Sequence, residues 1–241
     1  MGGRRRDAAD HGGGDAVSQA AELDHLVIGA RTLDEGVAWC EATLGVTPGP
    51  GGKHGLMSTH NRLLSIATPE FPRAYLEIIA IDPQAPEPGR VRWFDLDEGR
   101  VQQQLSQGPH LLHWVLRVPD IKSAHAQWRA LGLDAGELLQ ASRLTPQGEL
   151  RWQIAVRSDG RRLLQGALPL LIEWGEVHPA DTMAISGVQL RSLGVGSLDA
   201  EFARRALANL GLQGLGGHSG AAPFAVQLDT PKGLVSLQSL S

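Results

Sequence analysis

Two histidines interrupt apolar stretches of the sequence at matching places. His25 lies within Glu22-Leu-Asp-His-Leu-Val-Ile-Gly29, and His113 lies within His110-Leu-Leu-His-Trp-Val-Leu-Arg-Val118. Each stretch is short and apolar, which is typical of a buried or half-buried strand. An imidazole among apolar neighbours is costly unless it is paired or bound to a metal. The matching positions therefore predict a site assembled from two related halves, although a core histidine bonded to a backbone carbonyl is the alternative for each.

Two acids occupy matching places in later apolar stretches. Glu77 lies in Tyr75-Leu-Glu-Ile-Ile79, 52 residues after the first histidine, and Glu173 lies in Leu171-Ile-Glu-Trp174, 60 residues after the second. Two imidazoles and two carboxylates form a complete ligand set that suits Zn²⁺, Fe²⁺, Mn²⁺ or Ni²⁺. Two alternatives to a ligand role are open for Glu173: its side chain faces solvent, or it pairs with Arg151 or Arg162.

The pleat of a strand sets a condition on this interpretation. Successive side chains of a regular strand point to opposite faces. His25 must then share a face with Val27, and Glu77 must share one with Tyr75 and Ile79. We expect all four candidate ligands on the concave face of a curved sheet, with the helices on the other face.

The elements that would position these side chains form a repeating pattern. A first unit, residues 21–90, begins with a strand and continues into a helix over Leu33–Leu44. Thr32 is its expected N-cap, Glu35 the capping-box partner, and Gly45 its end. Two further strands, over 53–66 and 74–81, complete the unit.

A second unit, residues 110–180, follows a linker over 91–109. It is expected to begin with a strand over 111–118 and a helix over 121–131. Two strands follow, over 149–156 and 163–166, with a turn at 158–160 between them, and the closing strand covers 168–175. A shorter third copy, 184–241, has an expected strand over 185–194, a helix over 199–210 and a hairpin over 224–238. At the register of the two histidines this copy has Leu190, so we expect it to be structural.

The pattern predicts an α+β fold. Repeated βαβββ modules would form a curved mixed sheet with helices on its outer face, and the shorter C-terminal βαββ copy would pack with them as one globular unit. Residues 1–20 are rich in Gly, Ala, Asp and Arg, and we expect a disordered tail there.

The charge, the cysteine content and the lengths of the apolar stretches argue against several classes of protein. A formal net charge of −4 over 241 residues, with no basic stripe, argues against a nucleic-acid partner. The single cysteine, Cys40, rules out an intrachain disulfide and fits a reducing compartment. No stretch approaches the roughly 20 apolar residues that cross a bilayer, and no signal peptide is evident, so we expect a cytoplasmic protein.

The repeated unit, with His, Glu, His and Glu in this order, resembles the vicinal oxygen chelate superfamily, of which glyoxalase I is the best-known member. More narrowly, several motifs resemble the glyoxalase-like domain group within that superfamily. The match covers about residues 22–180. Its motifs are Leu23-Asp-His-Leu-Val27, Gly51-Gly-Lys-His54, Ser58-Thr-His-Asn61, Tyr75-Leu-Glu-Ile-Ile-Ala-Ile-Asp-Pro83 and Arg92-Trp-Phe94.

The resemblance implies metal ligands on the first and last strands of both modules. Those positions are His25, Glu77, His113 and Glu173. A carboxylate that leaves the metal when substrate binds, Glu173 or Glu77, would act as the catalytic base.

Three other residues are candidates for contacting the substrate. His54 and Asn61 are polar residues on expected strands, and we expect them to line the pocket, with a surface hairpin as the alternative. Trp93 would form an apolar wall over the site, or would only tie the linker to the core.

These expectations lead to one function hypothesis and two alternatives. The first is an isomerase or lyase in which a divalent metal chelates two oxygens of a small substrate and stabilises an enediolate or similar oxyanion. The second is an Fe²⁺ dioxygenase that uses His25, His113 and one glutamate. The third is a metal-free protein that binds a small molecule in the same cleft. A homodimer is compatible with all three.

Overall fold

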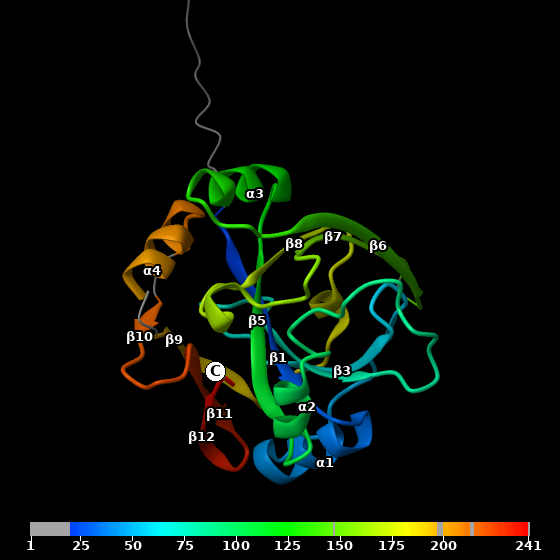
Figure 1. The fold of residues 1–241 in the computed structure, drawn as a ribbon. Coiled ribbons are helices and arrows are strands. Elements are labelled where there is room, and N and C mark those ends of the chain that lie inside the picture. Colours follow the sequence, from blue (N-terminus) through cyan, green and yellow to red (C-terminus); the bar gives the residue numbers. More distant parts are fainter. Residues whose placement is uncertain (1–19, 147, 197–199, 213–214, 241) are drawn as a thin grey trace, which may run out of the picture.

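The computed structural model describes residues 20–146, 148–196, 200–212 and 215–240. The tail expected over residues 1–20 lies outside them apart from Ala20. The described residues form an eight-stranded sheet that curls into a half-barrel, a smaller four-stranded sheet and four α-helices (Figure 1). None of these helices is both long and apolar enough to cross a membrane.

Two βαβββ modules build the large sheet, as the repeat predicted. The first contains β1 (Glu22–Gly29), α1 (Leu33–Leu44), β2 (Lys53–His54), β3 (Thr59–Ser65) and β4 (Tyr75–Ile81). The short helix α2 (Gly99–Leu105) lies between the modules. The second contains β5 (His110–Arg117), α3 (Ile121–Ala130), β6 (Glu137–Thr145), β7 (Gly148–Val156) and β8 (Leu170–Trp174).

The strand order shows how the modules meet. It is β2-β3-β4-β1-β5-β8-β7-β6, so the first strands of the two modules lie side by side as an antiparallel pair. Within each module the first strand pairs in parallel with the last. The strands expected to carry the four candidate ligands are therefore the four central strands of the sheet.

Local sequence explains the ends of α1. The Thr32 hydroxyl accepts a hydrogen bond from the backbone N–H of Glu35, and Gly45 ends the helix in the left-handed conformation, with φ 80°. The Glu35 carboxylate pairs with Arg31 and not with the backbone of Thr32. Only one half of the expected capping box is therefore formed.

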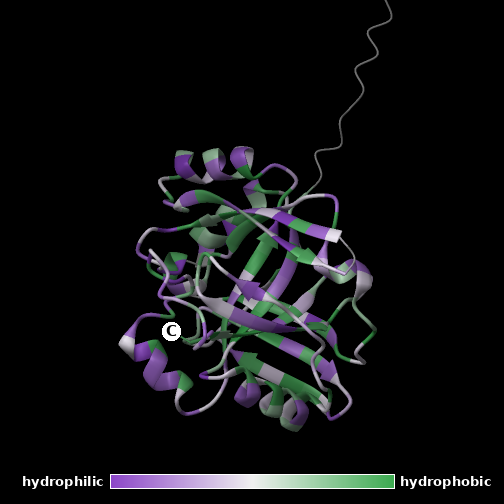
Figure 2. Cartoon of the chain, turned by 90° about the vertical axis from the view of Figure 1, so that its right-hand side faces the viewer, coloured by the Kyte–Doolittle hydropathy of each residue, from purple (hydrophilic) through white to green (hydrophobic). Residues whose placement is uncertain are grey.

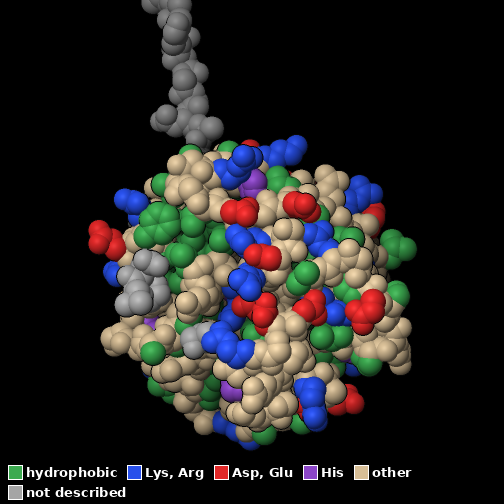
Figure 3. Space-filling model, in the orientation of Figure 1, with side chains coloured by type: hydrophobic (Ala, Val, Ile, Leu, Met, Phe, Trp, Pro, Cys, Tyr) green, Lys and Arg blue, Asp and Glu red, His purple; other side chains and the backbone are tan. Residues whose placement is uncertain are grey.

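The two faces of the large sheet contact different partners. Helices α1 and α3 pack on the convex face through Leu44 and Trp128. The concave face carries a second apolar cluster, which includes Val27 and Ile79, and the segment between β4 and β5 covers it with Trp93. In Figure 2 much of the sheet is hydrophobic, whereas the outer helices carry hydrophilic residues. Figure 3 shows positive and negative side chains interspersed on one surface.

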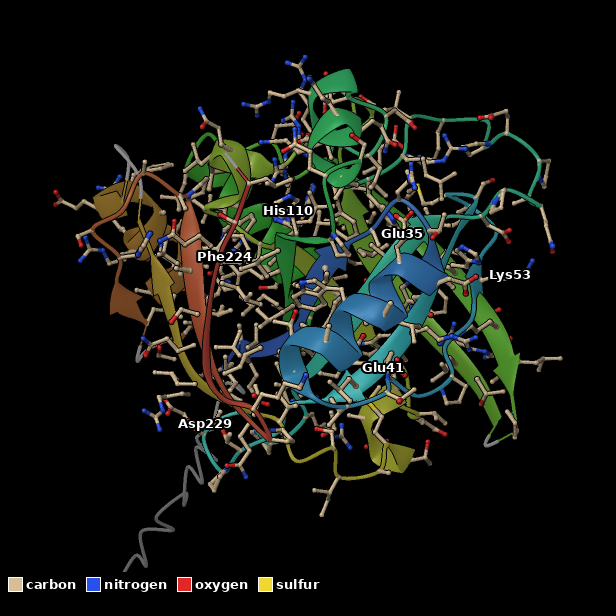
Figure 4. The ribbon with its side chains drawn as sticks, turned by 90° about the horizontal axis from the view of Figure 1, so that it is seen from below. Glu35, Glu41, Lys53, His110, Phe224 and Asp229 are labelled. Carbon is tan, nitrogen blue, oxygen red and sulfur yellow. The ribbon has the colours of Figure 1, made fainter. Side chains whose placement is uncertain are left out.

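The third unit packs on the convex face beside α1 and α3. It contains β9 (Gln189–Val195), α4 (Ala200–Asn209), β10 (Gly216–Gly217), β11 (Phe224–Thr230) and β12 (Gly233–Gln238), and Figure 4 shows β11 and β12 beside α1. The Phe224 ring lies 6.2 Å from the Trp114 ring, and Trp128 Nε1 donates to the Ala206 carbonyl at 3.3 Å. Leu190 is buried in this shared core.

The pairing within the third unit differs from that of the two full modules. Its strand order is β10-β9-β11-β12, so its first strand pairs antiparallel with β11 and has no parallel partnership with the last strand. The third unit therefore begins with a strand and a helix as the full modules do, but its strands pair differently from theirs. The expected start of its helix at Asp199 lies outside the described residues.

Two expected strand assignments are wrong. The partner of β7 is β6 and not the segment Leu163–Gly166, which is a 3-10 turn. Leu164 and Gln165 have φ values of 47° and 58°, and this left-handed backbone cannot continue a strand. The single strand expected over 53–66 is split into β2 and β3 by a turn, in which Ser58 has φ 50°.

Candidate active site

A β-bulge places two neighbouring residues of β1 on the same face. Leu23 pairs with Leu116 and His25 pairs with Val115, so Asp24 is an extra residue in the ladder. Such a residue interrupts the alternation of side chains. The carboxylate of Asp24 and the imidazole of His25 consequently meet on the concave side, with Asp24 Oδ1 and His25 Nδ1 2.6 Å apart.

The Asp24 carboxylate is fully buried and binds groups from both modules. Besides His25, its Oδ2 accepts hydrogen bonds from Trp174 Nε1 and His178 Nε2, both at 2.9 Å. Burial alone would raise the pKa of this carboxyl, but the hydrogen bonds from His178 and His25 outweigh it and hold the pKa below its usual range. Asp24 is therefore an ionised anchor beneath His25.

Glu77 of β4 faces the other side of the His25 ring. Its Oε2 lies 3.5 Å from His25 Nε2, and its Oε1 accepts a hydrogen bond from Asn61 Nδ2 at 2.6 Å. Burial opposes ionisation of both groups, but their mutual attraction and hydrogen bonds outweigh it. The pKa of Glu77 falls to about 2 and that of His25 rises to about 9. Without a bound cation, His25 is an imidazolium between two carboxylates.

His54 of β2 completes the polar group as a neutral imidazole. Its Nδ1 lies 3.0 Å from Thr59 Oγ1, and its Nε2 lies 3.3 Å from Asn61 Nδ2 and 3.8 Å from Glu77 Oε1. Burial lowers the pKa of His54 to about 4. Because the Asn61 amide nitrogen is a donor, the Nε2 of His54 is the acceptor and its proton is on Nδ1.

The orientation of Asn61 is set by the glycine loop before β2. Asn61 Oδ1 accepts from the backbone N–H of Gly52 at 2.7 Å, which turns its nitrogen toward Glu77 and His54. A Cβ added at Gly51 would lie 2.1 Å from the Asn61 carbonyl oxygen. The loop can lie against Asn61 only because residue 51 has no side chain.

Aromatic rings enclose this group. The Tyr75 ring stacks on His25 with centroids 4.6 Å apart, and the Trp93 ring contacts His54 edge-on with centroids 5.2 Å apart. The cavity between these rings has a volume of about 40 Å³, which holds no more than a few water molecules. His25, His54, Asn61 and Glu77 all line it.

His113 lies on the same sheet but does not line this cavity. Its ring packs against Phe94, with centroids 5.4 Å apart, and its Nδ1 has no hydrogen-bond partner among the described residues. Burial, with the positive charge of Arg162 nearby, holds the pKa of His113 well below its usual value. The structure therefore places a neutral imidazole beside the polar group and not within it.

Glu173 points away from the group. Ile172, its neighbour in β8, belongs to the concave cluster, whereas Glu173 Oε2 accepts from the backbone N–H of Ile121 at 2.8 Å, at the start of α3 on the convex face. The expectation that all four candidate ligands converge is wrong for Glu173, because strand alternation places it on the outer face. It pairs with neither Arg151 nor Arg162, which bind Glu149 and Asp95.

The donor atoms fit a divalent metal in chemistry. The Nε2 atoms of His25 and His54 lie on either side of the Glu77 carboxylate, and the Nδ1 of each ring is held by an oxygen, as is usual for metal-binding histidines. In the part of the chain that the structure describes, no three His, Cys, Asp or Glu side chains stand ready to hold an ion. The amide of Asn61 lies between His54 and Glu77 and bonds to both.

Sequence reasoning missed several members of the site. Asp24 was missed because a regular strand would point it away from His25, and a bulge has no clear sequence signal here. His178 follows the expected closing strand and was not assigned to the site, but it is buried and bonds to Asp24. Tyr75 shares a face with Glu77, so strand alternation could have found it. Arg143 lies on β6, which was not expected as a strand.

Comparison with known families agrees with this architecture. The family model described as "Glyoxalase-like domain" matches residues 23–211. The chain belongs to this family. The glyoxalase-like family is part of the vicinal oxygen chelate superfamily, which confirms the resemblance inferred from the motifs. No curated protein matches the sequence.

Three solved structures that resemble this member of the glyoxalase-like family are distant from it in sequence. A hypothetical protein from Staphylococcus aureus is 16% identical, with a TM-score of 0.55 over 92% of this chain and 87% of that one. The methylmalonyl-CoA epimerase of Streptomyces coelicolor is 20% identical, with a TM-score of 0.40 over 66% of this chain and 99% of that one. The epimerase of Mycobacterium tuberculosis is 18% identical, with a TM-score of 0.38 over 66% and 90%. At 16% identity the likeness to the Staphylococcus aureus protein concerns the fold alone.

Proposed function

We propose that this protein is a metal-dependent enzyme that acts on a small substrate with oxygens on adjacent carbons. The observation that carries the proposal is the arrangement around Glu77. Two imidazoles present Nε2 atoms at 3.5 and 3.8 Å from its carboxylate, and both rings are held at Nδ1. Ligands that share one tetrahedral ion at about 2.0–2.2 Å are separated by comparable distances.

The proposed ligands are His25, His54 and Glu77. This set differs from the one implied by the superfamily pattern, because His54 replaces His113 and Glu173 has no part in it. Binding an ion would require the Asn61 amide to turn away from the space between His54 and Glu77. A bound divalent metal would supply a Lewis acid that polarises a substrate carbonyl.

The chain's own residues supply the remaining functions. Asp24 holds the His25 ring in one orientation and fixes the proton on Nδ1. Glu77 lines this cavity and, if substrate displaced it from the metal, would be the carboxylate that accepts a proton from the substrate. Asn61 Nδ2 can donate a hydrogen bond to a developing oxyanion, and Trp93 and Tyr75 exclude water from the reaction space.

The test is metal binding by isosteric variants. Metal content by mass spectrometry and Zn²⁺, Ni²⁺, Fe²⁺ and Mn²⁺ titrations would be measured for wild type, His54→Gln and Glu77→Gln. We expect both variants to lose more than about 100-fold in affinity for the metal that wild type binds best. His113→Gln and Glu173→Gln are the matched controls and should bind as wild type does.

The other outcomes have definite meanings. Loss of metal in His113→Gln but not in His54→Gln would overturn the proposed ligand set in favour of the one implied by the superfamily pattern. In that case, oxygen uptake with a catechol would separate a dioxygenase from an isomerase or lyase. Wild-type protein that binds none of the four ions would overturn the metal-dependent function.

One observation favours a metal-free binding protein as the second candidate. His25, charged between Asp24 and Glu77, forms a buried triad that is already complete without an ion. In such a protein the same cleft would only bind a small molecule. Ligand affinity that survives the combined loss of His25 and His113 would support this candidate.

A further inference from the structure

Arg143 lies on the concave face of β6. Leu139 and Ala141 pack against the concave apolar cluster, and Arg143 is the next residue along the same face. Leu144 points the other way and is 86% exposed. The arginine therefore extends toward the interior of the half-barrel.

Arg143 stands between two cavities. One is the cavity of about 40 Å³ at the polar group, and the other is an outer cleft of about 890 Å³, which is within the usual size range for a small-molecule site. Leu63, Arg143 and Pro179 line both cavities. Arg143 therefore lies where the outer cleft adjoins the cavity that Glu77 lines.

The guanidinium of Arg143 has no partner in the described residues. Its buried Nη1 has no hydrogen-bond acceptor, and it forms no ion pair. Lys53, which also lines the outer cleft, is neutralised by Asp82 at 2.7 Å. A buried N–H without an acceptor is destabilising, so a ligand group that accepts hydrogen bonds from this guanidinium would be favoured at the cavity.

Two neighbouring features are consistent with a binding role. Arg143 Nη1 rests directly over Gly52, where an added Cβ would lie 1.7 Å away, so the glycine leaves room for the guanidinium. Trp93, which is 6% exposed and lines the inner cavity, has an Nε1 without an acceptor in the described part of the chain. Two unpartnered donors thus belong to residues that line one small cavity.

We infer that Arg143 binds an oxyanion, a carboxylate or a phosphate, on the substrate of this site. The planar guanidinium can donate two parallel hydrogen bonds to such a group. The inference rests on the proposed function for the reacting end of the molecule. It adds that the substrate is an anion whose charged group binds where the two cavities join.

The walls of the outer cleft indicate the rest of the substrate. They are largely apolar, and Ile185 at the rim is 96% exposed. A short apolar tail attached to the charged group would cover these residues. The apolar lining residues include Val46, Leu63, Leu150, Val177, Met183 and Ile185.

The test uses three probes that share a short alkyl tail. They are 2-oxohexanoate, hexyl phosphate and the neutral heptane-2,3-dione. Calorimetry would measure their binding to purified wild type, Arg143→Gln and the control Arg151→Gln, whose side chain is exposed and pairs with Glu149. We expect Arg143→Gln to weaken oxyanion binding by about tenfold or more and to leave the dione unchanged. Arg151→Gln should behave as wild type for all three probes.

Repeating the titrations after metal removal by a chelator separates this inference from the proposed function. If wild type binds no metal and Arg143→Gln still weakens oxyanion binding, the inference about Arg143 is supported and the metal-dependent function is overturned. Equal oxyanion affinity in wild type and Arg143→Gln would overturn the inference whatever the metal content, and so would wild type that binds neither oxyanion. Tighter binding of 2-oxohexanoate would indicate a carboxylate substrate, and tighter binding of hexyl phosphate would indicate a phosphate.

Discussion

The Nδ1 atom of His25 lies 2.6 Å from Asp24 Oδ1, although the two residues are neighbours in one strand. A regular strand would point them to opposite faces, and the bulge at Asp24 brings them together. The same carboxylate also binds Trp174 and His178 from the second module. Asp24 therefore connects the orientation of His25 to the packing of the two modules.

Replacing Asp24 by Asn tests this connection. The neutral amide cannot stabilise the imidazolium. Its NH₂ group, itself a donor, must face either His25 or the donors of Trp174 and His178. We expect the pKa of His25 to fall toward its ordinary value and metal affinity to drop about 10- to 100-fold. NMR titration of the imidazole and Zn²⁺ calorimetry measure the two effects, with the exposed Asp120→Asn as control. An unchanged pKa of His25 would rule out the anchoring role.

The stability of the metal-free protein should depend on pH through His25. Its pKa of about 9 in the folded state lies above the ordinary value of 6.5, so the stabilisation is complete below about pH 6.5 and is lost as pH rises through 9. We expect wild type to lose roughly 2–3 kcal/mol more than His25→Gln between pH 6.5 and 10 in urea unfolding.

The titratable groups that face His25 do not change their protonation state between pH 6.5 and 10. Asp24 and Glu77 have lowered pKa values and stay ionised over that range. Burial raises the pKa of Tyr75 and lowers that of His54, so both remain neutral. Parallel pH profiles for wild type and His25→Gln would contradict the assignment of the charge to His25.

The two glycines before β2 should respond differently to alanine. At residue 51 the added Cβ would overlap the Asn61 backbone, with 2.1 Å to its carbonyl oxygen, so the loop or β3 must move. At residue 52 it would meet only the end of the flexible Arg143 side chain. We expect Gly51→Ala to destabilise the protein by about 2 kcal/mol and Gly52→Ala by less than about 1 kcal/mol.

Thermal unfolding measures both glycine variants, and oxyanion titration gives a second readout for Gly52→Ala. Because its methyl group displaces the guanidinium, that variant should weaken 2-oxohexanoate binding in the same direction as Arg143→Gln. A stable Gly52→Ala protein with unchanged oxyanion affinity would argue against the position assigned to Arg143.

The third unit should unfold together with the rest of the chain. Phe224 is fully buried and packs against Trp114 of β5, in a core that both sheets share. We expect Phe224→Ala to cost about 3–5 kcal/mol and to lower the midpoint of a single unfolding transition. Differential scanning calorimetry would measure the shift of the midpoint, with the exposed Leu234→Ala as control. Two separate transitions in wild type would show that the third unit is independent.

Much of the architecture follows from local patterns in the sequence. The apolar stretches around His25 and His113, each followed by a helix that ends near a glycine, predict the repeat, and the repeat predicts the central strands. The pattern failed in the second module. Leu163–Gly166 is as apolar as a strand, but its backbone turns in the left-handed region, and β6 carries too many polar residues to look like a strand.

Composition and spacing alone determined that this chain has two full modules, in which the strands of His25 and His113 correspond, as do those of Glu77 and Glu173. Only the tertiary structure decided which side chains meet. The bulge turned Asp24 inward, strand alternation turned Glu173 outward, and the β6–β7 hairpin brought Arg143 to the cavity. The physical reason is that periodicity is encoded locally, whereas the facing of a side chain depends on strand register, which a single extra residue reverses.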